Sequence, residues 1–229
     1  MRQEFVETSN TRKFFEICKE LSDPASKIGP SLAMVTGPAG RGKTEAARRW
    51  ATLTDAVYLP PLNIRTPAMI LREIAFELAG IKPKRSEACL DIIGEEMAKH
   101  RRLVIVDEAD LLSMQVLEML RNANERFAIP ILLIGEDDLR GRIASRRRLA
   151  SRIRRRMEFG PVNQQDIAFF FKQSLAPVPA DVTSMIQQYA KGDWRPVLTI
   201  ALAIERTMKA SSTNEITVEM VQHVLQRAA

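Results

Sequence analysis

The segment Gly37–Thr44 (GPAGRGKT) constrains the fold of this chain more than any other feature. It matches every position of the pattern G-x-x-x-x-G-K-[ST], follows the apolar run Leu32–Thr36 and precedes a helical pattern over Lys43–Leu53. A strand, loop and helix in this order form an anion-binding site, because successive backbone N–H groups of the loop and the N-terminus of the helix point to one place. A chance glycine-rich turn is the alternative. We expect Lys43 to reach the β- and γ-phosphates of ATP and Thr44 to offer its hydroxyl to Mg²⁺.

Short apolar runs alternate with helical patterns over the first 160 residues. Strands are expected at residues 32–36, 56–59, 103–106, 129–134 and 155–159. Helices are expected at about residues 11–21, 43–53, 66–80, 86–100 and 113–127. Short strands separated by helices are typical of a parallel sheet that is covered on both faces. The prediction is therefore an α/β fold, a P-loop nucleotide-binding domain with a five-stranded parallel sheet.

Beyond Gly160 the pattern becomes helical only. Helices are expected at residues 163–175, 182–190, 194–209 and 217–227, with the proline-rich connection Ala176–Ala180 after the first. We therefore expect three parts: an N-terminal helical segment over residues 1–26, the nucleotide-binding domain over residues 27–160, and a small helical lid domain over residues 161–229.

Composition limits the compartment and the class of protein. No window approaches 18 uninterrupted apolar residues, and the N-terminus lacks the apolar stretch of a signal peptide, so we expect no membrane association and a cytoplasmic location. The net charge is 34 minus 28, or +6, yet Arg140–Met157 alone holds nine arginines and no acid. Outside that window the balance is 25 minus 28, or −3. Positive charge is therefore concentrated in one place.

A second motif, Leu103–Asp110 (LVIVDEAD), places two acids at the end of an apolar strand. Parallel strands present their carboxyl ends at one edge of the sheet, where the phosphate loop also lies and where Mg²⁺ needs oxygen ligands. Asp107 is the predicted Mg²⁺ ligand, and Glu108 is predicted to orient and polarise the attacking water. A strand merely capped by solvated acids is the weaker alternative. The pair indicates an ATPase rather than a passive phosphate-binding protein.

The run Ile131–Gly135 is expected to lie in the sheet between these two strands and to present a polar residue to the γ-phosphate. Glu136 occupies that position. Because a carboxylate is repelled by phosphate, Glu136 is expected either to turn away or to pair with an arginine or the metal. We expect slow hydrolysis as a consequence, and an unchanged turnover rate in Glu136→Asn would contradict this hypothesis.

The arginine window Arg140–Met157 has two interpretations. As a solvated surface it needs no specific role. The more specific interpretation assigns Arg152, which precedes the last strand, to a nucleotide bound by a neighbouring subunit. In the helical region, Arg195 begins a helix, where the helix dipole disfavours a cation, so a bound phosphate would explain it better than plain surface exposure.

A second basic cluster, Lys82–Arg85 (KPKR), lies between two expected helices. A solubilising turn is one interpretation. The other is sequence-independent contact with a nucleic-acid backbone, through Lys82, Lys84 and Arg85. Since only 6% of residues are aromatic, base stacking is not expected to dominate.

In this order, the phosphate loop, the Asp-Glu strand end, Ser151–Ile153 (SRI) and Gly192–Arg195 (GDWR) resemble the AAA+ ATPases. Together with Phe5–Thr8 (FVET) and Gly37–Arg48 (GPAGRGKTEAAR), they look like the phage Mu transposition protein B family of transposon target-selecting ATPases.

By this resemblance, Lys43, Thr44, Asp107 and Glu108 would be the ATPase residues, Arg152 would act in trans, and Arg195 would sense nucleotide from the lid. The nucleotide contacts that the resemblance implies are Phe5, Val6, Gly37, Pro38, Ala39, Gly40, Arg41, Gly42, Lys43, Thr44, Glu45, Glu136 and Arg195, with Phe5 and Val6 against adenine. Where the phage Mu protein has an asparagine, this sequence has Glu136.

The family resemblance also implies partners. ATP would drive assembly of a homo-oligomer, a helical filament or a ring, on double-stranded DNA in the cytoplasm of a bacterial host. The oligomer would present target DNA to a transposase and stimulate it, with Lys84 and Arg85 lining the DNA. A replication initiator or helicase-loader ATPase, and a nucleotide-gated signalling switch, are the alternatives.

Overall fold

The computed structural model describes residues 5–23, 29, 31–61 and 66–228. The chain divides into two compact units. The sheet unit comprises Thr11–Pro38 and Lys43–Phe159, and the helical unit comprises residues 5–10, Ala39–Gly42 and residues 160–228. The expected boundary between residues 26 and 27 lies outside the described residues.

Five strands build the sheet: β1 (Leu32–Thr36), β2 (Val57–Leu59), β3 (Val104–Val106), β4 (Ile131–Ile134) and β5 (Ile153–Glu158). All pairs are parallel, in the order β2-β3-β4-β1-β5. β4 therefore lies between β1 and β3, as predicted. The α/β fold with a five-stranded parallel sheet is confirmed.

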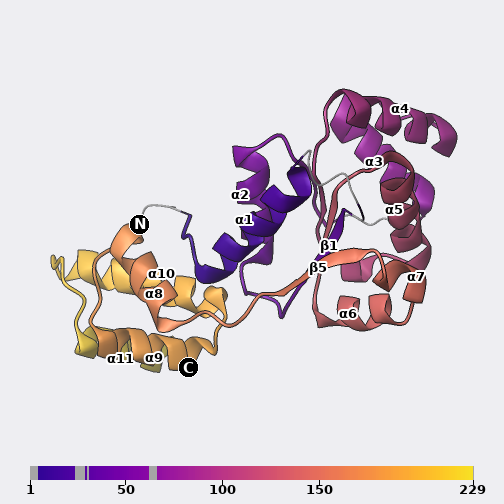
Figure 1. The fold of residues 1–229 in the computed structure, drawn as a ribbon. Coiled ribbons are helices and arrows are strands. Elements are labelled where there is room, and N and C mark those ends of the chain that lie inside the picture. The colour runs from indigo at the N-terminus through magenta and orange to yellow at the C-terminus, as the bar shows by residue number, and fades with distance from the viewer. Residues whose placement is uncertain (1–4, 24–28, 30, 62–65, 229) are drawn as a thin grey trace. The chain divides into compact units, whose positions relative to one another are not determined.

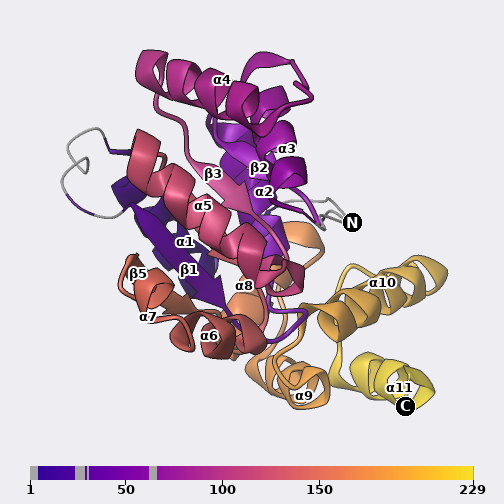
Figure 2. The ribbon, with the colours of Figure 1, turned by 90° about the vertical axis from the view of Figure 1, so that its right-hand side faces the viewer.

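Helices cover both faces of this sheet. On one face lie α3 (Pro67–Ala79), α4 (Ser86–Lys99), α5 (Met114–Phe127), α6 (Asp137–Ala144) and α7 (Arg147–Ala150), whose buried residues share one core (Figure 2). On the other face α1 (Ser9–Ser22) and α2 (Lys43–Leu53) form a second core with aromatic residues (Figure 1). The sequence pattern did not predict α6, α7 or the 3₁₀ turn η2 (Ala109–Leu111).

Local capping explains several helix boundaries. The Thr66 hydroxyl accepts from the N–H of Met69 at 3.4 Å, and Pro67 supplies a first-turn φ that suits a helix. Gly80 ends α3 in the left-handed conformation, with φ of 71°. Ser113 caps α5 in the same way as Thr66 caps α3, accepting from Val116 at 3.3 Å.

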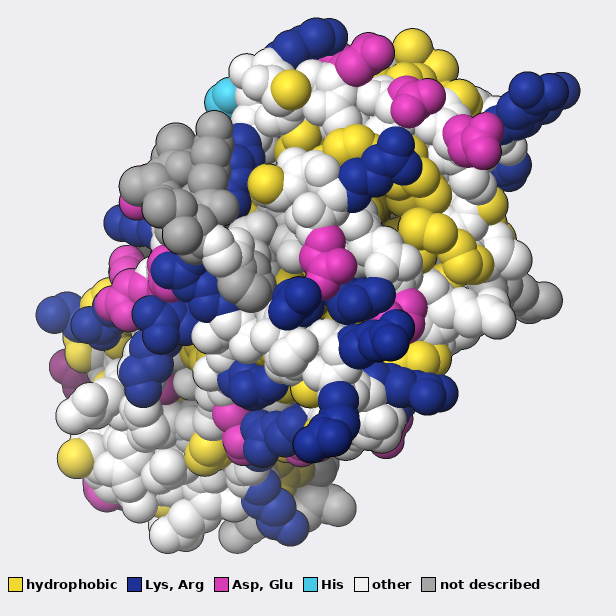
Figure 3. All heavy atoms as spheres, turned by 45° about the vertical axis from the view of Figure 1, so that its right-hand side comes forward, with side chains coloured by type: hydrophobic (Ala, Val, Ile, Leu, Met, Phe, Trp, Pro, Cys, Tyr) yellow, Lys and Arg dark blue, Asp and Glu magenta, His cyan; other side chains and the backbone are white. Residues whose placement is uncertain are grey.

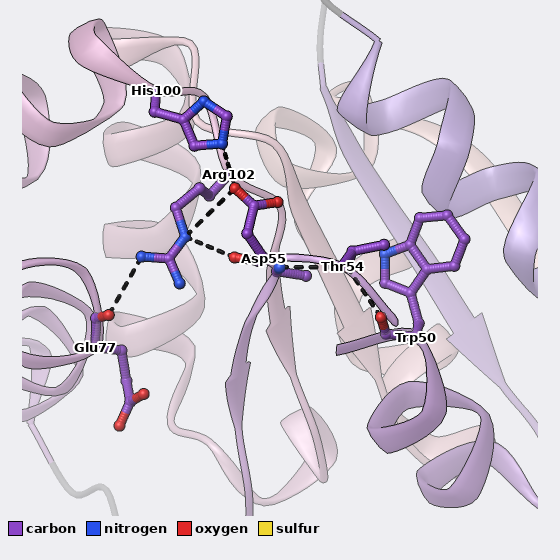
Figure 4. Close-up of polar contacts among 7 residues, drawn as sticks. Trp50, Thr54, Asp55, Glu77, His100 and Arg102 are labelled. Atoms are coloured by element: carbon purple, nitrogen blue, oxygen red, sulfur yellow. Dashed lines mark hydrogen bonds and ion pairs between the residues drawn. The ribbon is translucent and has the colours of Figure 1, made fainter. Parts of the chain in front are cut away.

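A polar cluster joins the amino ends of β2 and β3 (Figure 4). Arg102 Nε donates to the carbonyl of Asp55 at 2.6 Å, and Arg102 Nη1 donates to the carbonyl of Glu77 at 3.4 Å. His100 pairs with the carboxylate of Asp55. The strands are parallel, so this cluster lies at the edge of the sheet opposite to Asp107 and serves to fix where β2 and β3 begin.

The helical unit contains α8 (Gln164–Ser174), α9 (Ala180–Ala190), α10 (Trp194–Ala210) and α11 (Val218–Ala228), grouped together in Figure 1. These helices share one apolar core, against which Val6 also packs. An Asn163–Asp166 capping box starts α8. Among the described residues, none of the helices combines the length and the apolar character needed to cross a membrane.

Candidate nucleotide site

The loop after β1 adopts the backbone conformation that its glycines permit. Gly37, Gly40 and Gly42 have φ of 145°, 75° and 95°, in the region that side chains disfavour. A Cβ on Gly37 would lie 2.8 Å from the carbonyl oxygen of Phe159, so this position also lacks room for a side chain. Lys43 Nζ donates to the carbonyls of Gly37 and Pro38 at 2.6 and 2.9 Å. The ammonium is thereby held at the loop.

The end of β3 brings a buried carboxylate to the same edge of the sheet. Asp107 is 4% exposed; its Oδ1 accepts from the N–H of Glu108 at 2.9 Å and its Oδ2 accepts from the hydroxyl of Tyr58 at 2.8 Å. Burial and the negative charge of Asp107 raise the pKa of Tyr58 to about 12. Within the described part of the chain, no cationic side chain forms an ion pair with Asp107 at 4.0 Å or less. A buried charge of this kind favours a bound cation.

The charges of four acidic side chains act on the ammonium of Lys43. Burial lowers the pKa of Lys43, while the negative charge of Glu136 opposes that shift, followed by the charges of Asp107, Asp110 and Asp137. These acids follow β3 and β4, whose carboxyl ends lie at the same edge of the sheet as the carboxyl end of β1. The sheet topology brings Lys43, Asp107 and Glu136 together.

Glu108 has a special backbone conformation and a raised basicity. Its φ is 49°, in the left-handed region that non-glycine residues seldom adopt. Partial burial raises its pKa, and the neighbouring charges of Asp107, Asp110 and Glu136 raise it further. A more basic carboxylate is better suited to accept a proton from water.

Asp110 and Arg142 connect the β3 and β4 ends, a link that the sequence did not reveal. Asp110 Oδ1 accepts from the N–H of Glu136 at 3.0 Å. Arg142 donates to the carbonyls of Asp110 and Leu112. The carboxylate of Glu136, at the start of α6, is exposed and forms no ion pair with any residue that the structure describes. The pairing with an arginine that was one expectation is therefore not seen.

The residues present fit a magnesium ion bound together with a nucleotide. No group of three or more His, Cys, Asp or Glu side chains within the described ranges could hold a metal alone. Mg²⁺ commonly takes one or two protein oxygens and completes its shell with phosphate oxygens and water. Thr44, in the first turn of α2, and Asp107 supply oxygens of the required type. Their role as metal ligands stays a prediction.

The tip of the phosphate loop belongs to the helical unit and touches the start of α10. The N–H of Trp194 donates to the carbonyl of Gly40 at 2.9 Å, and Arg41 donates to the carbonyl of Lys191 at 3.3 Å. A Cβ on Gly40 would lie 2.0 Å from the carboxylate of Asp193. A side chain at this position would have to displace the carboxylate of Asp193 and would strain the backbone, whose φ is 75°.

Besides the loop residues Ala39–Gly42, the helical unit holds three further predicted nucleotide contacts. Arg195 lies in the first turn of α10, where its N–H donates to Asp193 Oδ1 at 2.7 Å and its side chain is exposed. Phe5 and Val6 are half-buried. The contacts of these three residues with a nucleotide remain predictions, as do those of Glu45, which is exposed in the first turn of α2.

Figure 3 shows many Lys and Arg side chains gathered over part of the surface. Many members of the arginine window have partners: Arg140 pairs with Glu158, Arg152 with Glu125, and Arg154 and Arg155 with Glu20. Three consecutive arginines at the start of α7 are exposed: Arg146, Arg147 and Arg148. Arg152 thus pairs within its own chain, and its action on another subunit stays a prediction.

The loop between α3 and α4 divides its cations. Lys82 Nζ contacts both carboxylate oxygens of Glu73 at 2.8 Å and lies 4.5 Å from the ring centroid of Phe76. Lys84 and Arg85 have exposed side chains, and the carbonyl of Lys84 accepts from Arg72 at 2.6 Å. The loop therefore offers Lys84 and Arg85 to a partner more freely than Lys82.

Comparison with known proteins agrees with this geometry. The model of the AAA domain family matches residues 27–143, more than half of the chain. The Mu-like prophage FluMu DNA transposition protein B of Haemophilus influenzae is 34% identical over 137 residues, covering 58% of this chain and 46% of that protein. The ATP-dependent target DNA activator B of Escherichia phage Mu is 30% identical over 172 residues, covering 71% and 54%. The chain thus spans about half the length of these relatives.

Solved structures share the fold. The crystal structure of Cdc6p from Pyrobaculum aerophilum superposes with a TM-score of 0.71, at 19% sequence identity, over 97% of this chain and 69% of that one. Identity this low carries information about the fold alone.

Proposed function

The chain belongs to the AAA domain family, and from this premise we propose that it is an ATPase that binds double-stranded target DNA for a transposase. The observation that carries the proposal is the 30% identity to the phage Mu target DNA activator, over 71% of this chain. In this chain one edge of the sheet holds the phosphate loop, the buried carboxylate of Asp107 and the carboxylate of Glu108, whose pKa is raised.

The hydrolytic step follows from these side chains. The γ-phosphate of ATP would lie between the loop N–H groups and Lys43, whose ammonium offsets the charge that develops on the phosphate oxygens. Glu108 accepts a proton from water as the water oxygen bonds to the γ-phosphorus. The bond from that phosphorus to the β,γ-bridging oxygen breaks, which gives ADP and phosphate. Mg²⁺, held by Thr44 and Asp107, would neutralise phosphate charge.

Turnover is expected to be slow without a partner. Burial lowers the pKa of Lys43 and the negative charge of Glu136 opposes that shift, so the charge of Glu136 acts on the ammonium that we assign to the γ-phosphate. A carboxylate and a phosphate repel each other, which weakens stabilisation of the transition state. DNA or the transposase would raise the rate by changing how Glu136 is placed.

The test of the ATPase part is a pair of variants with different predicted defects. Lys43→Ala should lose nucleotide binding and hydrolysis together, whereas Glu108→Gln should keep nucleotide binding and lose at least about a hundredfold in turnover. Radiolabelled phosphate release and fluorescent nucleotide binding measure the two properties. Full turnover in Glu108→Gln would refute its role.

Assembly would complete the site between neighbouring copies of the chain. We assign Arg152 to the nucleotide of the adjacent subunit and Arg195 to the phosphates of its own subunit. Mixing Arg152→Ala chains with Glu108→Gln chains should restore part of the hydrolysis, because some interfaces then contain both intact residues. No recovery at any mixing ratio would show that Arg152 does not act in trans.

The DNA interface is proposed at the loop Lys82–Arg85, with Lys84 and Arg85 carrying most of the contact. Removing both charges should weaken binding to all sequences and lower the slope of log K against log salt by about 2. The control is the double change Arg12→Ala and Lys13→Ala, which removes two exposed charges from α1. Equal slopes for wild type and the Lys84/Arg85 variant would exclude this loop.

The partners follow from the relatives. We propose double-stranded DNA, a transposase and further copies of this chain, arranged as a filament or a ring, in the cytoplasm of a bacterial host. An initiator or helicase-loader function rests on the likeness to structures such as Cdc6p, whose identity of 19% speaks for the fold alone. Target DNA activation is therefore the better supported function.

A further inference from the structure

A tyrosine hydroxyl stands behind the carboxylate that is proposed to bind Mg²⁺. Tyr58 Oη donates to Asp107 Oδ2 at 2.8 Å, and Asp107 is buried. We infer that Tyr58 is a positioning residue, which orients Asp107 for the Mg²⁺ of the bound nucleotide and is itself held by Arg48. This inference rests on the proposed ATPase function and adds two residues to its site.

Strand register explains why a tyrosine at this position reaches the carboxylate. Tyr58 is the central residue of β2 and pairs with Ile105 of β3, while the N–H of Asp107 donates to the carbonyl of Leu59 at 3.1 Å. Side chains alternate along a strand, so Ile105 and Asp107 point to the same face as Tyr58. The tyrosine side chain is long enough for its hydroxyl to extend past Ile105 and contact Asp107, the next residue of the chain on that face.

Arg48 supports the hydroxyl from the helix that follows the phosphate loop. A tyrosine hydroxyl has one donor proton and can also accept hydrogen bonds. Its proton goes to Asp107, and the positive charge of Arg48 acts on the hydroxyl, where it opposes the rise in the pKa of Tyr58 that burial and Asp107 cause. Arg48 lies one turn beyond Thr44 on α2. Arg48 thus lies on the helix that carries Thr44, and its charge acts on the tyrosine that contacts Asp107.

The two hydrogen bonds to Asp107 fix the plane of its carboxylate. Oδ1 accepts from the N–H of Glu108 and Oδ2 accepts from Tyr58, and each oxygen keeps further acceptor capacity for a cation. Without the hydroxyl, one of the two restraints on rotation of the carboxylate is lost. Outer partners of metal ligands commonly change metal affinity by about 10–100-fold when they are removed.

The test measures metal dependence separately from nucleotide binding. Tyr58→Phe keeps the ring and removes the hydroxyl; affinity for fluorescently labelled ADP is measured in EDTA and across a Mg²⁺ titration. We expect the Mg²⁺ concentration for the half-maximal effect to rise about tenfold while the affinity in EDTA stays within about twofold. The matched control is Tyr189→Phe, the same change in the helical unit, which should leave both values unchanged.

A second variant keeps the test decisive should Tyr58→Phe fail to fold. Arg48 is exposed, and Arg48→Ala should raise the half-maximal Mg²⁺ concentration about threefold, since it acts through Tyr58. Arg49→Ala, the next residue and also exposed, is its control. Equal Mg²⁺ dependence of wild type, Tyr58→Phe and Arg48→Ala would overturn the positioning role. Absence of nucleotide binding by the wild-type chain would instead overturn the proposed ATPase.

Discussion

Gly135→Ala tests how tightly the ends of β3 and β4 are joined. A Cβ on Gly135 would lie 2.4 Å from Asp110 Oδ1, 3.0 Å from a Leu139 methyl carbon and 3.1 Å from the backbone nitrogen of Asp110. The carboxylate of Asp110 must then move away from the N–H of Glu136, which it contacts at 3.0 Å. Loss of a hydrogen bond to a charged group costs about 1.5–3 kcal/mol, and overpacking adds about 1–3 kcal/mol.

We therefore expect Gly135→Ala to lower the free energy of unfolding of the sheet unit by about 2.5–6 kcal/mol. Gly141→Ala is the control, because nothing lies within 4 Å of its Cβ position in α6; it should stabilise by about 0.5–1 kcal/mol. Urea unfolding followed by Trp50 fluorescence, in a Trp194→Phe background, reports the sheet unit alone.

A double-mutant cycle with Asp110→Ala checks the cause. When the carboxylate is already absent, the added methyl group of Gly135→Ala should cost much less, so the two changes should couple by more than about 1 kcal/mol. Additive effects, or equal stability of the Gly135→Ala and Gly141→Ala variants, would refute the link between Asp110 and the backbone of Glu136.

Three further changes probe the same edge of the sheet. The folded-state pKa of Glu108 is raised, so ionisation of Glu108 destabilises the fold as pH rises through that pKa. Glu108→Gln should therefore have a higher melting temperature than the wild type at pH 8, and calorimetry should show this difference disappearing toward pH 4. Glu136→Asn should increase the steady-state ATP turnover rate, because it removes a charge that repels phosphate. Arg142→Ala should lower the free energy of unfolding, measured by urea unfolding, by about 1.5–3 kcal/mol, because two carbonyls lose a charged donor. The control Arg147→Ala removes an exposed arginine and should change that free energy by less than about 0.5 kcal/mol.

The strands were predictable because buried parallel strands need apolar residues on both faces. The run at residues 32–36 coincides with β1, and the run at 103–106 differs from β3 by one residue. β5 was predicted over residues 155–159 but spans Ile153–Glu158. It is an edge strand whose central arginines are exposed, so its apolar pattern is weak.

The helices α6 and α7 escaped prediction for a related reason. Only Leu139, Ile143 and Leu149 are buried in this stretch, and arginines fill most positions between them. The sequence therefore resembles a solvated charge run. In the structure, Arg142 of this run caps the carbonyls of Asp110 and Leu112.

The site divides into contiguous motifs and contacts between separate segments. Gly37–Thr44 and the Asp107–Glu108 pair are visible in the sequence because each is a single stretch with a known chemical purpose. The hydrogen bond from Tyr58 to Asp107 depends on the register of β2 against β3, which three-residue strands do not specify on their own. The same holds for Asp110 and the N–H of Glu136.

The central claim is that ATP controls binding to DNA, and one measurement tests it directly. Anisotropy of a labelled DNA duplex is recorded with ATP, with ADP and without nucleotide, across a salt series, for the wild type and Lys43→Ala. The account predicts cooperative binding with ATP only, with affinity that falls steeply with salt, and no ATP effect in Lys43→Ala. Equal DNA affinity of the wild type in all three nucleotide conditions would contradict it.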